Sequence, residues 1–405
     1  MESIQIIKQA ENDAHQMMKN YGISYETGFM AESPFQDLPH NTGNRKRDTY
    51  LEHIHRMASS LPGLTSINKV ENAVNQLKVS DWPVDDLPRE SQYHLFLDLG
   101  MTMHAYFKEK LGYQTVQDLQ ADESTKFMPA QLATPLWKLG KITGMDPTLS
   151  YILLGLWNNT KKPGYDPTKP EDFGTIHTFT GEKDEKWFLR VHHSVQATEA
   201  PAYPHLFRAY LLSQYPFEDI PVDYMIQCFK EAALPLLRRV AVLKRMADMD
   251  AGTYFERVRM FYPFPRNVIY EGVEEIKDQP QNFGGQTGGN RQSQQVEDNI
   301  MGVVHRETSN EYRLLMRQKM PKESRELISG LENSRIREFV LANRDNQELA
   351  MGYNMVIFTM VDWGTEHDNQ SFGNIGRFGE TRGTGSPHLT LLHDMTMDRR
   401  NALIY

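Results

Sequence analysis

A mostly α-helical fold is predicted by the spacing of apolar residues along the chain and by the scarcity of strand patterns. Apolar side chains recur at near-helical spacing in residues 91–112, 221–250, 321–342 and 345–367. Only residues 175–181 alternate between apolar and polar side chains, and that stretch is short. We therefore expect helices to form nearly all of the regular structure.

Two of these segments contain residues that should bend or end a helix. Pro235 lies inside 221–250 and is expected to kink the helix or mark a junction, because proline lacks the amide donor and crowds the preceding turn. Residues 321–342 are expected to form two short helices that separate near Gly330 and Asn333.

The last helical segment, 345–367, is apolar on nearly every side between Leu349 and Trp363, so it is expected to be central and buried. Two glycine-rich stretches, 261–295 and 364–388, interrupt the helical pattern. Glycine lets the backbone approach a ligand closely, which favours lids or ligand-contacting loops. The alternative is that both stretches are merely mobile connections.

A chain of 405 residues is long enough for two or three domains. Residues 158–174 combine three prolines, two glycines and several charges, which is typical of a domain boundary. We therefore predict a small N-terminal helical domain at 1–170 and a large helical domain at 171–405.

Composition excludes several classes of protein. The net charge is -9 and no basic stripe is present, so nucleic acid is not an expected partner. Cys228 is the single cysteine, which excludes a disulfide framework and a cysteine-based metal site. The sequence contains neither the apolar run of a membrane span nor a secretory signal pattern at its start, so we expect a cytoplasmic protein without a membrane partner.

The common catalytic and nucleotide-binding motifs are incomplete or absent in this sequence. The glycines of 283–290 (FGGQTGGN) have neither phosphate-loop spacing nor a strand–GxGxxG–helix context, and no G-x-S-x-G motif is present. Among the histidines, His53 and His55 are set in a helical pattern, where an HxH pair diverges and does not chelate a metal. His192 and His193 are adjacent, so in a helix at most one of them faces a given pocket.

His367 ends the apolar segment and precedes a glycine-rich stretch. The helix face that contains His367 also contains residues that are small, flat or soft, namely Gly364, Met360, Ile357, Val356 and Tyr353. This arrangement suits a planar apolar ligand with a metal at its centre, namely haem. The alternative is a C-terminal histidine that satisfies the last helix carbonyls and the helix dipole.

Several segments resemble the indoleamine 2,3-dioxygenase family. YEGV at 270–273 followed by FGGQTGGNRQSQQVED at 283–298 is similar to a glycine-rich segment of that family. Residues 317–367, from RQKMP to DWGTEH, resemble without gaps its block that ends in the proximal haem histidine. GTGSPHL at 383–389 resembles the family's GTGGTxL.

The resemblance continues upstream. DEKWFLRVHHSVQATEAPA at 184–202 is similar to a segment of fungal members, and YGISYETGFMAESPFQDLP at 21–39 resembles the family's opening, which precedes a small helical domain. The similarity thus covers nearly the whole chain, in order and at similar spacing. The same superfamily includes tryptophan 2,3-dioxygenase and the chlorotryptophan-rearranging enzyme of pyrrolnitrin biosynthesis.

The resemblance implies a haem site in the large domain. His367 falls on the proximal iron ligand, and Thr287 and Gly288 fall in the loop over the haem edge. Thr384 falls on a hydroxyl that meets the substrate's amino end and a haem propionate, and Leu389 closes the same segment beside the cofactor. Gly288 also borders the substrate. The implied cofactor is haem b.

The resemblance also implies a substrate pocket. Tyr151 and Phe188 fall on its lining, Tyr254 replaces a phenylalanine, and Arg259 falls on the arginine that clamps the substrate carboxylate. His192 takes the distal position that is serine in mammalian members and histidine in tryptophan 2,3-dioxygenase. It has three possible roles: accepting the indole N–H, fixing the ring's register, or hydrogen-bonding bound dioxygen. Without the resemblance, a surface or salt-bridging arginine is the favoured interpretation of Arg259, and the alternative for His192 is a core histidine hydrogen-bonded to a carbonyl.

We therefore expect a haem-dependent oxidoreductase that uses O2 to cleave the indole C2–C3 bond of L-tryptophan or an indole derivative, giving an N-formylkynurenine-type product. One alternative is a haem monooxygenase or rearranging enzyme acting on a modified tryptophan, suggested by His192 and Tyr254. The other is a haem-binding or gas-binding module without turnover, which has no need of Arg259 as a carboxylate clamp. The oligomeric state is not predicted.

Overall fold

The computed structural model describes residues 2–32, 43–78, 84–383 and 389–405. The α-helices of the first half are α1 (Glu2–Asn20), α2 (Arg45–Ser59), α3 (Leu61–Ser66), α4 (Val70–Asn75), α5 (Arg89–Leu111), α6 (Val116–Ala121), α7 (Ala130–Thr143), α8 (Lys183–Glu199) and α9 (Tyr203–Leu212). Those of the second half are α10 (Val222–Lys244), α11 (Ala251–Thr253), α12 (Gln292–Ile300), α13 (Glu307–Gln318), α14 (Lys322–Gly330), α15 (Ile336–Ala342), α16 (Gln347–Asn374) and α17 (Thr390–Arg400).

Shorter elements connect these helices. Short 3₁₀ and π segments are η2 (Ile152–Trp157), η3 (Pro170–Asp172), η4 (Ala200–Ala202), η5 (Phe217–Asp219), η6 (Arg245–Asp248), η7 (Tyr254–Val258), η8 (Arg259–Phe261), η9 (Glu274–Ile276), η10 (Gly288–Asn290), η11 (Leu331–Asn333) and η12 (Gly376–Phe378). Strand β1 (Lys126–Met128) pairs in parallel with β4 (Val268–Tyr270), and β2 (Thr160–Lys161) pairs antiparallel with β3 (Phe173–Gly174). The predicted mostly α fold is confirmed.

Most of the predicted helices form where expected. Residues 91–112 lie within α5 and its cap, where Gly112 ends the helix in the left-handed conformation that glycine adopts without strain. The break predicted near Gly330 and Asn333 is present between α14 and α15. Helix α10 continues through Pro235, so the alternative of a junction at this proline is wrong.

The short alternating stretch 175–181 contains no strand, because the amides of Phe179, Thr180 and Gly181 donate to the carboxylate of Glu185 and turn the chain into α8. One local prediction was wrong. The glycine-rich stretch that was expected to start at Gly364 is helical up to Asn374. A Cβ atom on Gly364 would overlap Thr396, so this glycine lets α16 and α17 approach each other closely instead of breaking the helix.

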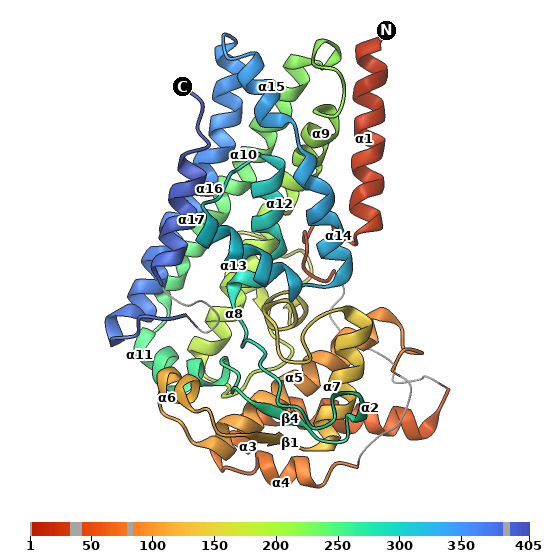
Figure 1. Cartoon of the computed structure of the whole chain (residues 1–405), viewed down its shortest axis with the longest axis vertical. Coiled ribbons are helices and arrows are strands. Elements are labelled where there is room, and N and C mark those ends of the chain that lie inside the picture. The colour runs from red at the N-terminus through yellow and green to blue at the C-terminus, as the bar shows by residue number, and fades with distance from the viewer. Residues whose placement is uncertain (1, 33–42, 79–83, 384–388) are drawn as a thin grey trace.

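The helices are divided between an upper and a lower part of the molecule in Figure 1. The upper part contains α10 packed against α16, with α17 along α16 and α1 beside α9. The lower part contains α2 to α7 and the β1–β4 pair. Since α1 packs on α9, and Tyr224 donates a hydrogen bond of 2.7 Å to Glu11, the N-terminal helix belongs with the upper part. The domain boundary at residue 170 stays a prediction.

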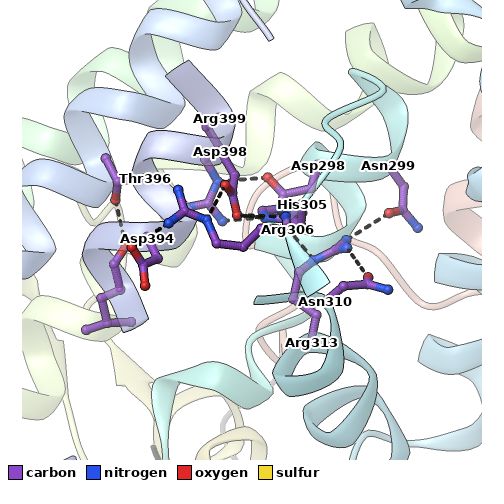
Figure 2. Close-up of polar contacts among 11 residues, drawn as sticks. Asp298, Asn299, His305, Arg306, Asn310, Arg313, Asp394, Thr396, Asp398 and Arg399 are labelled. Atoms are coloured by element: carbon purple, nitrogen blue, oxygen red, sulfur yellow. Dashed lines mark hydrogen bonds and ion pairs between the residues drawn. The ribbon is translucent and has the colours of Figure 1, made fainter. Parts of the chain in front are cut away.

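An ion-pair cluster joins α17 to α12 and to the connection between α12 and α13. Asp298 and His305 are buried in it, whereas Arg306 is 43% exposed. Figure 2 shows the carboxylate of Asp298 between Arg399, which donates to it at 2.8 and 3.1 Å, and His305, at 3.1 Å. Arg306 donates to Asp398 at 2.8 Å. Charged donors in a water-poor setting bond more strongly than neutral ones, so this cluster holds the helix that contributes one side of the cavity described next. Among the described residues, no helix combines the length and apolarity needed to cross a membrane.

Candidate active site

A cavity lies where α8, α16 and the start of α17 meet the loop before α12. It contains about 1220 Å³ of space free of protein atoms, part of it open to solvent. Nine of the ten residues singled out from the sequence line it, namely Tyr151, Phe188, His192, Tyr254, Arg259, Thr287, Gly288, His367 and Leu389. Thr384 lies outside the described residues.

Aromatic rings form one wall of the cavity. Phe188 stacks on Tyr254 with ring centroids 4.9 Å apart, and on Tyr262 at 5.8 Å. His192 meets the edge of Phe188 at 4.5 Å. Burial raises the pKa of Tyr254, so its hydroxyl stays protonated and neutral. Such flat, uncharged walls suit an aromatic ring as ligand. Tyr262 was not predicted from the sequence, because no local motif marks it.

His192 faces this cavity from α8, while its neighbour His193 is fully buried and does not line it. The expectation that at most one of the two faces the pocket is therefore confirmed. The Nδ1 atom of His192 lies 3.2 Å from the hydroxyl of Tyr151. Burial, with the neighbouring His367 and Arg291, lowers the pKa of His192 to about 3, which keeps the imidazole neutral at physiological pH.

His367 lines the same cavity from α16. It lies almost two turns before the end of that helix, so the alternative of a histidine capping the helix C-terminus is wrong. Burial, then the positive charges of Arg291 and Arg399, lower its pKa to about 4. The ring is therefore neutral and able to act as a metal ligand.

The residues around His367 fit a haem group. A Cβ built on Gly288 would lie 4.0 Å from His367 Nε2 and near no other atom, so a glycine here keeps the space in front of that nitrogen open. The surface of the cavity is mainly apolar, and Leu389, Leu392 and Met395 are among the residues that line it. A neutral nitrogen ligand that opens into a large apolar cavity is what a haem iron requires of its protein.

A buried charge network supports the helix that bears His367. Trp363, one turn earlier on α16, contacts the guanidinium groups of Arg239 and Arg291, which lie 5.1 and 4.3 Å from its ring centroid. Glu199 pairs with both arginines, at 2.7 Å for Arg239, and Glu297 pairs with Arg239. The network joins α8, α10, α12 and α16, and sequence reasoning missed it because its members lie far apart in the chain.

Arg259 is buried, with 1% of its surface exposed, so the alternative of a surface arginine is wrong. It is nevertheless salt-bridged: its Nη1 lies 3.2 Å from Glu380 Oε1, and its Nη2 donates to the carbonyl of Arg382 at 3.1 Å. Glu380 was not predicted, although it belongs to the glycine-rich stretch 364–388 that was expected to contact a ligand. Since Arg259 lines the cavity, a substrate carboxylate would share the guanidinium with Glu380.

The helical fold, a neutral histidine that opens into an apolar cavity, and an aromatic wall next to a buried arginine are features that suit a haem-dependent oxygenase. The model of the family described as "Indoleamine 2,3-dioxygenase" matches residues 17–369, and the chain belongs to that family. The predicted class, a haem-dependent dioxygenase that acts on an indole with O2, is confirmed at the level of the family.

Individual relatives are distant. The chain is 27% identical to indoleamine 2,3-dioxygenase 1 of Rattus norvegicus, over 86% of this chain and 82% of the relative. It is 23% identical to a myoglobin of Haliotis madaka over 86% of both chains. It is 21% identical to 6-hydroxytryptophan 2,3-dioxygenase fscD of Fusarium equiseti, over 85% of this chain and 81% of the relative.

Proposed function

We propose that this enzyme inserts both atoms of O2 across the indole C2–C3 bond of L-tryptophan or a ring-substituted tryptophan, giving an N-formylkynurenine. The observation that carries the proposal is the aromatic wall of Phe188 and Tyr254 in one cavity with Arg259 and His367. An α-amino acid with an indole side chain has a flat apolar ring for the wall and a carboxylate for the arginine. A non-catalytic oxygen carrier needs no such pair of features.

In this proposal His367 holds the iron of haem b, and Thr287, Gly288 and Leu389 border the macrocycle. When bound, haem supplies the activation of dioxygen. Phe188 and Tyr254 hold the indole ring in register, and Arg259 binds the carboxylate through its planar fork of donors. Thr384 is assigned, from the family resemblance alone, to the substrate's amino end. The protein's contribution is thus orientation of the substrate within the cavity.

His192 is proposed to donate a hydrogen bond into the cavity. Burial raises the pKa of Tyr151 to about 12, so its hydroxyl keeps its proton at neutral pH. We assign the protonated Tyr151 hydroxyl as the donor to Nδ1 of His192, 3.2 Å away, which would place the ring proton of His192 on Nε2. In that tautomer His192 donates into the cavity and does not accept the indole N–H.

Tyr151→Phe is expected to lower kcat by about fivefold with little change in KM, because it removes one hydrogen bond that orients His192 rather than a contact to the substrate's carboxylate. With a pKa near 3, His192 should not titrate between pH 5 and 8, so the pH profile of wild-type kcat should lack its ionisation. Steady-state kinetics across this range measure both. Tyr254→Phe, which also removes a cavity hydroxyl but leaves the His192 contact, is the matched control; equal losses in both variants would contradict the role of Tyr151.

The reduced, haem-loaded enzyme incubated with L-tryptophan and ¹⁸O2 tests the proposed function. A product that has gained two labelled oxygen atoms supports it, and 6-hydroxytryptophan is a second substrate to include because a relative is named for it. Gain of one oxygen atom would favour the monooxygenase alternative, and no product across a panel of indoles would favour an oxygen-binding module. The cytoplasmic location stays a prediction.

A further inference from the structure

A second group of histidines lies outside the cavity. His55 from α2, His94 and Asp98 from α5, and His177 from the segment between β3 and α8 converge so that one ligand atom from each lies within 4.8 Å of all the others. Three of the four side chains are almost completely buried, and His55 is 32% exposed. None of the four lines the cavity of the proposed active site.

The carboxylate of Asp98 is at the centre of this group. Its oxygens lie 2.6 Å from His177 Nε2, 3.3 Å from His55 Nδ1 and 3.5 Å from His94 Nε2. The ring centroid of His55 lies 4.8 Å from that of His94 and 5.0 Å from that of His177. Three imidazoles therefore present one nitrogen each to a space shared with one carboxylate.

We propose that His55, His94, Asp98 and His177 form a binding site for one divalent transition-metal ion, with zinc as the best match. Three imidazole nitrogens and one carboxylate oxygen are a typical four-ligand set for zinc. Bonds of about 2.0–2.2 Å would place the ligand atoms about 3.3 Å apart, so the widest pair must close by about 1.5 Å. Binding would therefore require side-chain rotations of this size within the cluster.

The surroundings are those of a metal site. Ser59 Oγ lies 3.4 Å from Nδ1 of His177, which leaves Nε2 of that ring turned toward Asp98. Ligand histidines in proteins are commonly oriented in this way through their second nitrogen. The partial exposure of His55 provides a path from solvent to an otherwise buried site.

The position of the site indicates its role. His55 and the His94–Asp98 pair belong to the lower helices of Figure 1, whereas His177 belongs to the chain that leads into α8 and the proposed active site. A bound ion would cross-link these segments, and with four protein ligands it would have no open position for catalysis. We therefore assign the ion a structural role that is independent of the proposed function.

The test uses the haem-loaded enzyme, stripped of loosely bound metal by a chelator and then titrated with Zn²⁺. Elemental analysis should find one zinc per chain in addition to the haem iron, and the melting temperature should rise with zinc. His94→Gln and Asp98→Asn should each weaken zinc binding by at least about 100-fold, with unchanged haem iron content and helicity. His53→Ala, an exposed histidine two residues from His55 on the same helix, should bind zinc as the wild type does.

X-ray absorption of the zinc-loaded wild type needs no substitution and should show imidazole ligands in a four-coordinate shell. Failure of the wild type to bind zinc above the level of an exposed histidine would overturn the proposal and leave the cluster as a hydrogen-bonded network around Asp98. Zinc binding that survives in both cluster variants would also overturn it, since the ion would then lie elsewhere.

Discussion

His367→Ala is expected to produce a folded, helical protein that no longer incorporates haem. The imidazole is the one neutral nitrogen ligand that α16 presents to the cavity, and its lowered pKa keeps it ready to bind iron at neutral pH. Cavity contacts to the macrocycle remain in the variant, but without the coordinate bond the group should be lost on gel filtration. The Soret absorbance per protein after reconstitution with hemin, together with far-UV circular dichroism, measures the two parts of this expectation.

Two further variants make the result specific. In His367→Gly the missing ring leaves a space next to Gly288, and imidazole added to the buffer should restore haem binding. His393→Ala removes a histidine from nearby α17 whose side chain is 64% exposed, and it should leave the haem spectrum unchanged. A normal spectrum in His367→Ala would show that another side chain holds the iron.

The helices were predictable because the apolar pattern that forms them is local. In α16, one face of the run from Leu349 to Trp363 is buried as predicted. The opposite face is not, since Met351, Met355 and Phe358 are exposed, so the prediction of a helix buried on nearly every side was only partly right. The C-terminal limit of α16 was not predictable, because Gly364 looks like a helix breaker in isolation. Only the close approach of Thr396 on α17 shows why a glycine is needed inside the helix. The same limit applies at 175–181, where the deciding partner is the carboxylate of Glu185.

The candidate site was predictable only through the family resemblance. Local chemistry pointed to His367, whereas Phe188, Arg259 and Tyr151 come from separate parts of the chain and meet only in the folded protein. Glu380 was not predicted, because nothing in the sequence of its glycine-rich stretch indicates that it pairs with Arg259. The histidine cluster was missed for the same reason, although His94 and Asp98, four residues apart on one helix face, are a signal that the sequence contains.

Arg259→Ala is expected to weaken substrate binding by about 2 kcal/mol or more, which is the cost of leaving a desolvated carboxylate without its partner. Substrate affinity, measured by spectral titration of the haem-loaded enzyme, should fall by a factor of about 30 or more. Arg259→Lys should recover only part of this loss, because an ammonium group does not reproduce the planar fork. Both variants also leave Glu380 without its guanidinium, so retention of haem and of helicity has to be measured alongside.

Glu380→Gln distinguishes the role of Arg259 in substrate binding from its role in the ion pair with Glu380. In the wild type the positive charge of Arg259 is already compensated by Glu380 at 3.2 Å, so an incoming carboxylate has to compete for it. The amide keeps an oxygen acceptor in place but removes the competing charge, and substrate affinity should therefore increase. Unchanged affinity in Arg259→Ala, with haem and helicity retained, would mean that the substrate lacks a carboxylate or binds elsewhere. In that case the Arg259–Glu380 pair would serve only to hold the segment after α16 over the cavity.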